Sequence, residues 1–364
     1  MTQTRRQFLT TGAALASAAS LGLAHKAHAA DPLGVTLVAP SPLGDVGWTH
    51  SLVAGLEKAK AELGSPINIT VLDSIGDGPD ADRIFQKTVS DGNKVLIAGS
   101  FGYQNAALQL ARRFPDVSVI HASGYQTAPN LANFAAKNFE GTYLLGMAAA
   151  ALTKSKKIGS VSAFAIPELI TSINAFALGA RAIDPEVEVS VVWVNSWFDP
   201  AKEQSAAKAL IAQGVDVIFS NAQDTPSVVA ACEEAGVYVG NLNSSMKAYA
   251  ATKYLGVADT DWSPYFKAEI EAHLSGTFKG AGHWLGMKDG VVRLLDLSPD
   301  VPADAKAKID EAEAGMIAGT FNPFTGPIKN AAGQEVVAAG AVMPDEQVLA
   351  MDYHVEGVVT PLPK

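Results

Sequence analysis

Cysteine is almost absent from this chain. Its single cysteine, Cys232, has no partner for a disulfide, and one thiol alone cannot build a thiolate metal cluster. Cys232 stands in a helical pattern with Val228 and Val229, which predicts a buried structural thiol rather than a nucleophile. No cysteine stands near residue 30, so the sequence offers no site there for a lipid anchor.

Long hydrophobic runs are also missing. The apolar stretch from Ala13 to Ala24 spans about a dozen residues, fewer than the roughly 20 that cross a bilayer. The adjacent Arg5 and Arg6 precede it, and small residues around Ala29 follow it. This pattern predicts a twin-arginine signal peptide over residues 1–30, cleaved near Ala29, and hence a periplasmic protein. An uncleaved anchor is the alternative.

Sequence motifs of common catalytic sites are absent. The chain has no Gly-x-Ser-x-Gly elbow, no phosphate-binding Gly-x-x-x-x-Gly-Lys loop and no His-Glu-x-x-His helix, and its histidines are scattered. We therefore expect no catalytic residues, no cofactor and no metal site. Asp259 and Asp261 alternate at period two without a nucleophile nearby, so we expect Asp261 to contact a ligand or to lie between two lobes.

Basic residues are too few for a nucleic-acid partner. Without the signal peptide, 24 basic residues remain against 37 acidic ones, a formal net charge of -13. An acidic surface repels the phosphate backbone and argues against nucleic acid as a partner.

Short apolar runs alternate with helical patterns along the whole mature chain, which predicts βαβ units and parallel sheets. The first series of expected strands covers residues 35–39, 67–72, 94–99 and 117–121, and the second covers 158–161, 187–194, 217–220 and 237–240. About 335 residues exceed what one core usually organises, so we expect an α/β protein of two doubly wound parallel-sheet lobes. The carboxyl ends of the strands should face a cleft that holds a ligand.

The loops after these strands carry aromatic and uncharged polar side chains. The candidates are Asp45, Trp48, Phe101, Tyr103, Trp197, Asn221 and Asn243. Flat rings beside amide groups suit a planar heteroaromatic ligand such as a nucleobase, because the ring stacks and an amide reads its edge. Each residue also has a plainer interpretation: Asp45 as a turn residue, and Trp48 as a staple at a helix start.

Several motifs occur in one order along the chain. They are Gly44-Asp45-Val46-Gly47-Trp48, Asn138-Phe139-Glu140-Gly141-Thr142-Tyr143, Ile166-Pro167-Glu168, Trp197-Phe198-Asp199-Pro200-Ala201-Lys202, Gly286-Met287-Lys288-Asp289-Gly290 and Asn322-Pro323-Phe324-Thr325-Gly326-Pro327. In these motifs the chain resembles the basic membrane protein family of ABC-importer binding proteins, relatives of the purine nucleoside receptors.

The resemblance implies a type I periplasmic-binding fold with a hinged cleft. Lobe 1 would comprise residues 31–137 with a later segment near 260–300, and lobe 2 residues 138–258 with a C-terminal segment near 301–364. Trp48 and Trp197 would stack on a purine, with Phe101 or Tyr103 closing the first-lobe side. Asn174, Asn221 and Asn243 would supply polar contacts.

The resemblance also bears on the ligand. Nucleoside-binding relatives usually carry an aspartate where this chain has Asn243, so a free base such as adenine is favoured over a nucleoside. The expected partners are this small molecule and the permease of an ABC importer, and a monomer is expected. A sugar receptor of the same fold is the alternative, followed by a periplasmic nucleoside hydrolase, since twin-arginine export often serves enzymes.

Overall fold

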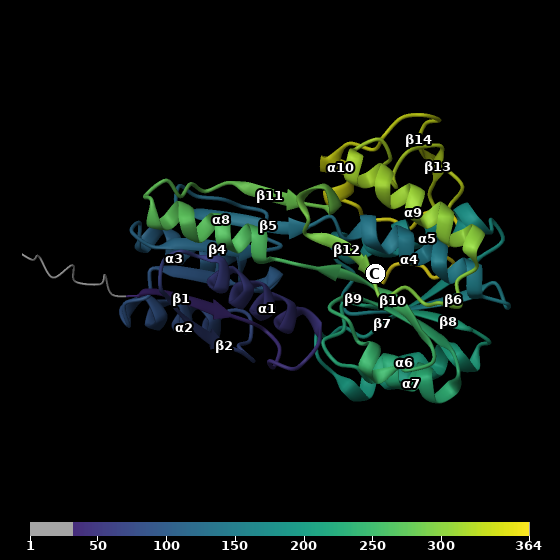
Figure 1. Ribbon diagram of the computed structural model, residues 1–364, viewed down its shortest axis with the longest axis horizontal. Helices are drawn as coiled ribbons and strands as arrows, with labels where there is room; N and C mark the ends of the chain where they lie inside the picture. Colours follow the sequence, from purple (N-terminus) through teal and green to yellow (C-terminus); the bar gives the residue numbers. More distant parts are fainter. Residues whose placement is uncertain (1–31, 364) are drawn as a thin grey trace, which may run out of the picture. The chain divides into compact units, whose positions relative to one another are not determined.

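Two six-stranded sheets, the second with one antiparallel strand, carry the fold of this computed structural model, which describes residues 32–363 (Figure 1). The export signal expected over residues 1–30 lies outside the described residues. The predicted α/β class with two helix-flanked parallel sheets is confirmed. Across residues 32–363, no helix combines the length and the hydropathy that a membrane span requires.

The first sheet has the strand order β11-β5-β4-β3-β1-β2, and all its neighbours pair in parallel. Its strands are β1 (Leu33–Val38), β2 (Ile67–Leu72), β3 (Val95–Ala98), β4 (Ser118–Ala122), β5 (Leu131–Ala136) and β11 (Gly282–Leu285). Its helices are α1 (Gly47–Glu62), α2 (Pro79–Ser90), α3 (Gln104–Arg113) and α8 (Ser263–Leu274). We call this sheet and these helices lobe 1.

The second sheet has the order β12-β10-β9-β8-β6-β7, and only β12 pairs antiparallel. Its strands are β6 (Lys157–Ser162), β7 (Glu188–Trp193), β8 (Val217–Asn221), β9 (Tyr238–Asn243), β10 (Tyr254–Thr260) and β12 (Val292–Leu295). Its helices are α4 (Asn138–Leu152), α5 (Pro167–Ile183), α6 (Pro200–Ala212), α7 (Ser227–Ala235), α9 (Ala303–Ala318) and α10 (Asp345–Leu349). With the short hairpin of β13 (Ile328–Lys329) and β14 (Glu335–Val337), these elements form lobe 2.

The chain passes between the lobes from β5 to α4, from β10 to α8 and from β11 to β12. In Figure 1 the green α8 and β11 accordingly lie among the purple and blue elements of lobe 1. The passages are bonded to one another. The Lys137 amide donates to the Leu285 carbonyl at 2.7 Å, and the Asp261 amide donates to the Val291 carbonyl at 2.8 Å.

Helices α4 and α5 touch through glycine. A methyl group on Gly146 of α4 would overlap the carbonyl oxygen of Phe176 in α5, and one on Gly179 of α5 would overlap that of Tyr143 in α4. The two backbones therefore lie in direct contact, which only hydrogen side chains at these positions permit. This contact holds the N-termini of α4 and α5 side by side, where Asn138 Nδ2 donates to Glu168 Oε1 at 3.3 Å.

We expect Gly146→Ala and Gly179→Ala each to destabilise the protein. Two packed backbones cannot yield to an added methyl group, so the thermal midpoint should fall by roughly 5 °C or more. Gly64→Ala is the matched control, because a methyl group there meets no atom within 4 Å. Circular dichroism during heating measures all three variants. Equal midpoints in the helix variants and the control would contradict the close packing.

Candidate functional site

A cavity lies between the lobes at the carboxyl ends of their strands, where ligands bind in open α/β sheets. The free space among its lining residues is about 490 Å³, open solvent included. Its lining consists of Pro40, Trp48, Ser100, Phe101, Ser123, Asn138, Ile166, Glu168, Leu169, Trp197, Ala222, Asp224, Leu242 and Asn243. Of the residues predicted from the sequence, this lining includes Trp48, Phe101, Trp197 and Asn243.

Two indole rings reach this cavity, one from each lobe. Trp48 stands at the start of α1, where its Nε1 donates to the Gly99 carbonyl at 2.7 Å. Trp197 lies in the loop between β7 and α6 and packs against Phe164, with 4.7 Å between the ring centroids. Each ring is thus held by its own lobe. The cavity is therefore lined by a large flat apolar side chain from each lobe.

A half-buried carboxylate and two amides supply polar groups. Glu168 lies in the first turn of α5 and accepts hydrogen bonds from Ser123 Oγ at 2.7 Å and from Asn138. Burial raises the pKa of the Glu168 carboxyl, and these bonds offset part of the rise. Asn138 Oδ1 is buried without a partner, and the Asn243 side chain makes no hydrogen bond to another residue in the range 32–363. Both amides remain available to a ligand.

A second carboxylate, Asp224, joins the lobes at the cavity edge. It follows β8 in lobe 2 and accepts hydrogen bonds from Ser41 Oγ at 2.5 Å and from the Trp48 amide at 2.6 Å, both in lobe 1. Burial raises the pKa of Asp224 to about 6, and the two hydrogen bonds offset only part of that rise. Gly47 beside it has a φ of 88°, and a side chain there would collide with Asp224. The β1–α1 loop therefore lies directly on lobe 2.

The structure places Tyr103, Asn174 and Asn221 in the protein interior, which corrects their expected role as ligand contacts. Tyr103 is fully buried beside Phe85, and its hydroxyl donates to the Ile75 carbonyl. Asn174 bonds the C-terminal segment, donating to the Tyr353 carbonyl at 2.7 Å. Asn221 donates to Ser162 Oγ at 3.2 Å. Their polar groups stabilise the fold, and none of the three lines the cavity.

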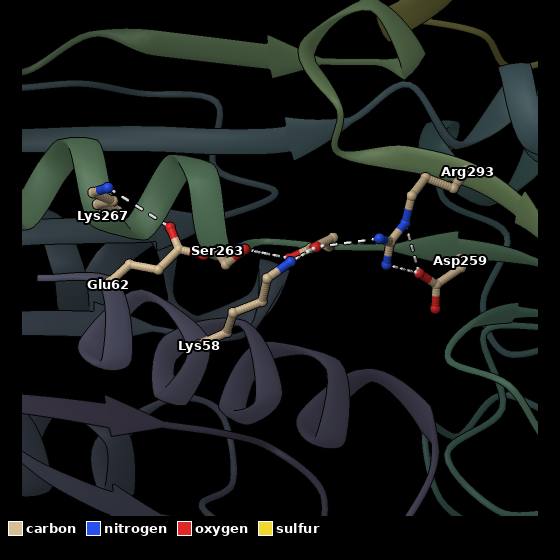
Figure 2. Close-up of polar contacts among 7 residues, drawn as sticks. Lys58, Glu62, Asp259, Ser263, Lys267 and Arg293 are labelled. Atoms are coloured by element: carbon tan, nitrogen blue, oxygen red, sulfur yellow. Dashed lines mark hydrogen bonds and ion pairs between the residues drawn. The ribbon is translucent and has the colours of Figure 1, made fainter.

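Asp45 and Asp261 connect the lobes and lie outside the lining of this cavity. The exposed Asp45 accepts a hydrogen bond from the Tyr249 hydroxyl of lobe 2 at 2.7 Å. Figure 2 shows Lys58 of α1 and Arg293 of β12 reaching toward each other. Between them, Asp261 Oδ2 pairs with Lys58 Nζ at 2.6 Å and with Arg293 Nη1 at 3.3 Å. The expected position of Asp261 between two lobes is what the structure has.

Sequence reasoning missed Glu168, Asp224, Asn138 and Ser123 as lining residues. Asn138 and Glu168 stood in motifs quoted for the family resemblance, and Asp224 closes the loop that follows β8. Their positions after strand ends were the signal that could have found them. Among residues 32–363, no group of three or more His, Cys, Asp and Glu side chains is placed to hold a metal ion.

Comparison with known proteins supplies the family. The family model described as ABC transporter substrate-binding protein PnrA-like matches residues 33–320. A purine-binding protein of Brucella abortus (strain 2308) is 37% identical over 350 residues, covering 96% of this chain and 99% of that protein. A Haloferax volcanii protein named as a candidate ABC transporter glucose-binding protein is 32% identical over 286 residues, 79% of this chain and 72% of that one.

Solved structures show the same fold. An ABC transporter solute-binding protein of Aeropyrum pernix K1 matches with a TM-score of 0.70 at 18% identity, covering 88% of this chain and 98% of that one. At this identity the likeness shows the fold alone. It confirms the predicted type I periplasmic-binding fold.

The raised pKa of Asp224 predicts a pH-dependent effect on stability. The folded protein holds this proton up to about pH 6, whereas an aspartate of the unfolded chain, with a pKa of 3.8, releases it near pH 4. Ionisation of Asp224 therefore lowers the stability of the folded state as pH rises through this window. Asp224→Asn keeps an acceptor for the Trp48 amide and removes this pH-dependent loss of stability. Relative to wild type, the variant should gain up to about 3 kcal/mol between pH 4 and pH 7.

Urea unfolding of wild type and Asp224→Asn at a series of pH values measures this gain. The exposed Asp45, which accepts one hydrogen bond from lobe 2, provides the matched variant Asp45→Asn. A stability difference for Asp224→Asn that stays flat or shrinks with rising pH would show that burial of the carboxylate does not dominate.

Proposed function

The chain belongs to the PnrA-like family of ABC transporter substrate-binding proteins, and from that premise we propose that it is a periplasmic receptor for a purine. The observation that carries the proposal is the pair of indole rings, Trp48 from lobe 1 and Trp197 from lobe 2, at one cavity between the lobes. A purine stacks between them and makes polar contacts along its edge. The relative in Brucella abortus, named a purine-binding protein, supports this choice.

The free base, with adenine as the example, is the favoured ligand. The Asn243 amide offers one donor and one acceptor, which is the pattern that a purine edge presents. The carboxylates at the cavity already accept hydrogen bonds from protein groups: Asp224 from Ser41 and Trp48, and Glu168 from Ser123 and Asn138. This leaves less acceptor capacity for the hydroxyl groups of a ribose, and so supports a base over a nucleoside.

The ligand works by joining the lobes. Each lobe contributes one indole, so a bound base gains its full contact area only when the lobes are closed, and binding shifts the population toward that state. The adjacent passages of chain between the lobes act as the hinge. The closed, monomeric, twin-arginine-exported protein then delivers the base to the permease of an ABC importer, with no chemical change to the ligand.

A sugar receptor is the second candidate, because the Haloferax volcanii relative is named as a candidate glucose-binding protein. Aromatic rings stack on sugars as well as on bases. Calorimetry with adenine, guanine, their nucleosides, glucose and ribose separates the candidates. We expect a dissociation constant for a purine base in the micromolar range or below, about -8 kcal/mol or better, and weaker binding of the nucleoside. Binding of a sugar without any purine would overturn the proposal, and release of base from a nucleoside would indicate a hydrolase.

Trp197→Ala should lower the affinity for every purine by roughly tenfold to a hundredfold, because base stacking on one aromatic ring contributes about 1 to 3 kcal/mol. The neighbouring Phe198 provides the control, since it is 42% exposed and does not line the cavity. Phe198→Ala should therefore leave purine affinities within about twofold of wild type. Calorimetry gives both values. Equal affinities for Trp197→Ala and wild type would remove this ring from the site.

A further inference from the structure

A second compartment adjoins the cavity that holds the two indoles. The free space among its lining residues is about 860 Å³, open solvent included, and the two spaces have the lining residues Phe101, Ser123, Asn138, Ile166 and Glu168 in common. The shared polar groups therefore stand at the junction, where both spaces reach them. A ligand that fills the first compartment has room to extend a substituent into the second.

The rest of the second compartment is apolar and aromatic. Tyr125 and Trp284 of lobe 1 face it together with Val348 and Leu349 of α10 in lobe 2. Two of the polar side chains in this part, Trp284 and Thr171, are already bonded. Trp284 Nε1 donates to the Ala136 carbonyl at 3.3 Å, and Thr171 Oγ1 donates to the Pro167 carbonyl at 2.6 Å. This wall offers little to the hydroxyl groups of a sugar and much to a hydrocarbon group.

Large side chains are exposed at this compartment. Tyr125 is 64% exposed and Leu349 is 53% exposed, and they come from opposite lobes. Their exposed surfaces would be covered in part by a ligand group that reaches between them. Burying such apolar area favours binding in proportion to the area removed from water.

We propose that the site takes purine bases that carry an apolar substituent, with the ring between Trp48 and Trp197 and the substituent in the second compartment. This inference rests on the proposed purine function and adds the class of purine. The ring occupies the same place in substituted and plain bases. The substituent adds its own contacts with Tyr125, Trp284 and Leu349.

The probes are adenine, the positional isomers N6-benzyladenine and 9-benzyladenine, and adenosine, which carries a polar group at the same nitrogen as 9-benzyladenine. We expect one benzyl isomer to bind about tenfold more tightly than adenine, from the apolar area that its ring buries. Adenosine should bind more weakly than adenine and than this benzyl isomer. Calorimetry on the wild-type mature chain gives these constants.

Leu349→Asp tests where the benzyl group lies. The side chain is more than half exposed, so the fold should tolerate the change, and adenine should bind as in wild type. The affinity for the tighter-binding benzyl isomer should fall about tenfold, because a carboxylate then lies beside its ring. Ile317→Asp on α9, which is 50% exposed and lines neither compartment, is the matched control.

The outcomes separate the two proposals. If adenine binds while both benzyl isomers bind more than tenfold more weakly, the second compartment does not take a substituent and this inference fails alone. A benzyl isomer that binds tightly and keeps its affinity in Leu349→Asp also overturns this inference, because its benzyl group then lies elsewhere. If no purine binds, the proposed function fails and this inference fails with it.

Discussion

The backbone contact between α4 and α5 is the constraint on which the site depends. Gly146 and Gly179 let the helices meet without side chains between them, and each helix begins at the cavity. Asn138 and Glu168, at those two beginnings, are therefore set next to each other in the lining. Because α4 also starts where the chain leaves lobe 1, the same contact fixes the polar end of the site and the first passage between the lobes.

The cavity belongs to neither lobe alone. Its lobe 1 wall is held against lobe 2 by the bonds of Ser41 and Trp48 to Asp224, and Lys58 and Arg293 meet at Asp261 outside it. Desolvation of Asp224 works against this closed arrangement, while its hydrogen bonds support it.

Sequence patterns predicted the two sheets and the strand-end loops because both depend on local periodicity. They missed two strands of each sheet. In the first sheet these are β5, whose sequence Leu-Ala-Asn-Phe-Ala-Ala contains no β-branched residue, and β11, which pairs with β5 from far along the chain. In the second sheet they are β10 and β12. Trp48 and Trp197 stood out as large rings in loops. Tyr103 and Asn174 are also an aromatic and an amide residue. Their hydrogen-bond partners, Ile75 and Tyr353, lie far away in the sequence, so no local pattern shows that these two side chains are buried. Which polar residue faces the cavity is decided by such distant partners.

Native mass spectrometry tests the central claim most directly. The mature protein would be freed of bound molecules by unfolding and refolding, offered an equimolar mixture of purine bases, nucleosides and monosaccharides, and separated from unbound molecules before measurement. We predict one retained purine base per protein chain. A retained monosaccharide, or a protein that keeps no purine from the mixture, would contradict it.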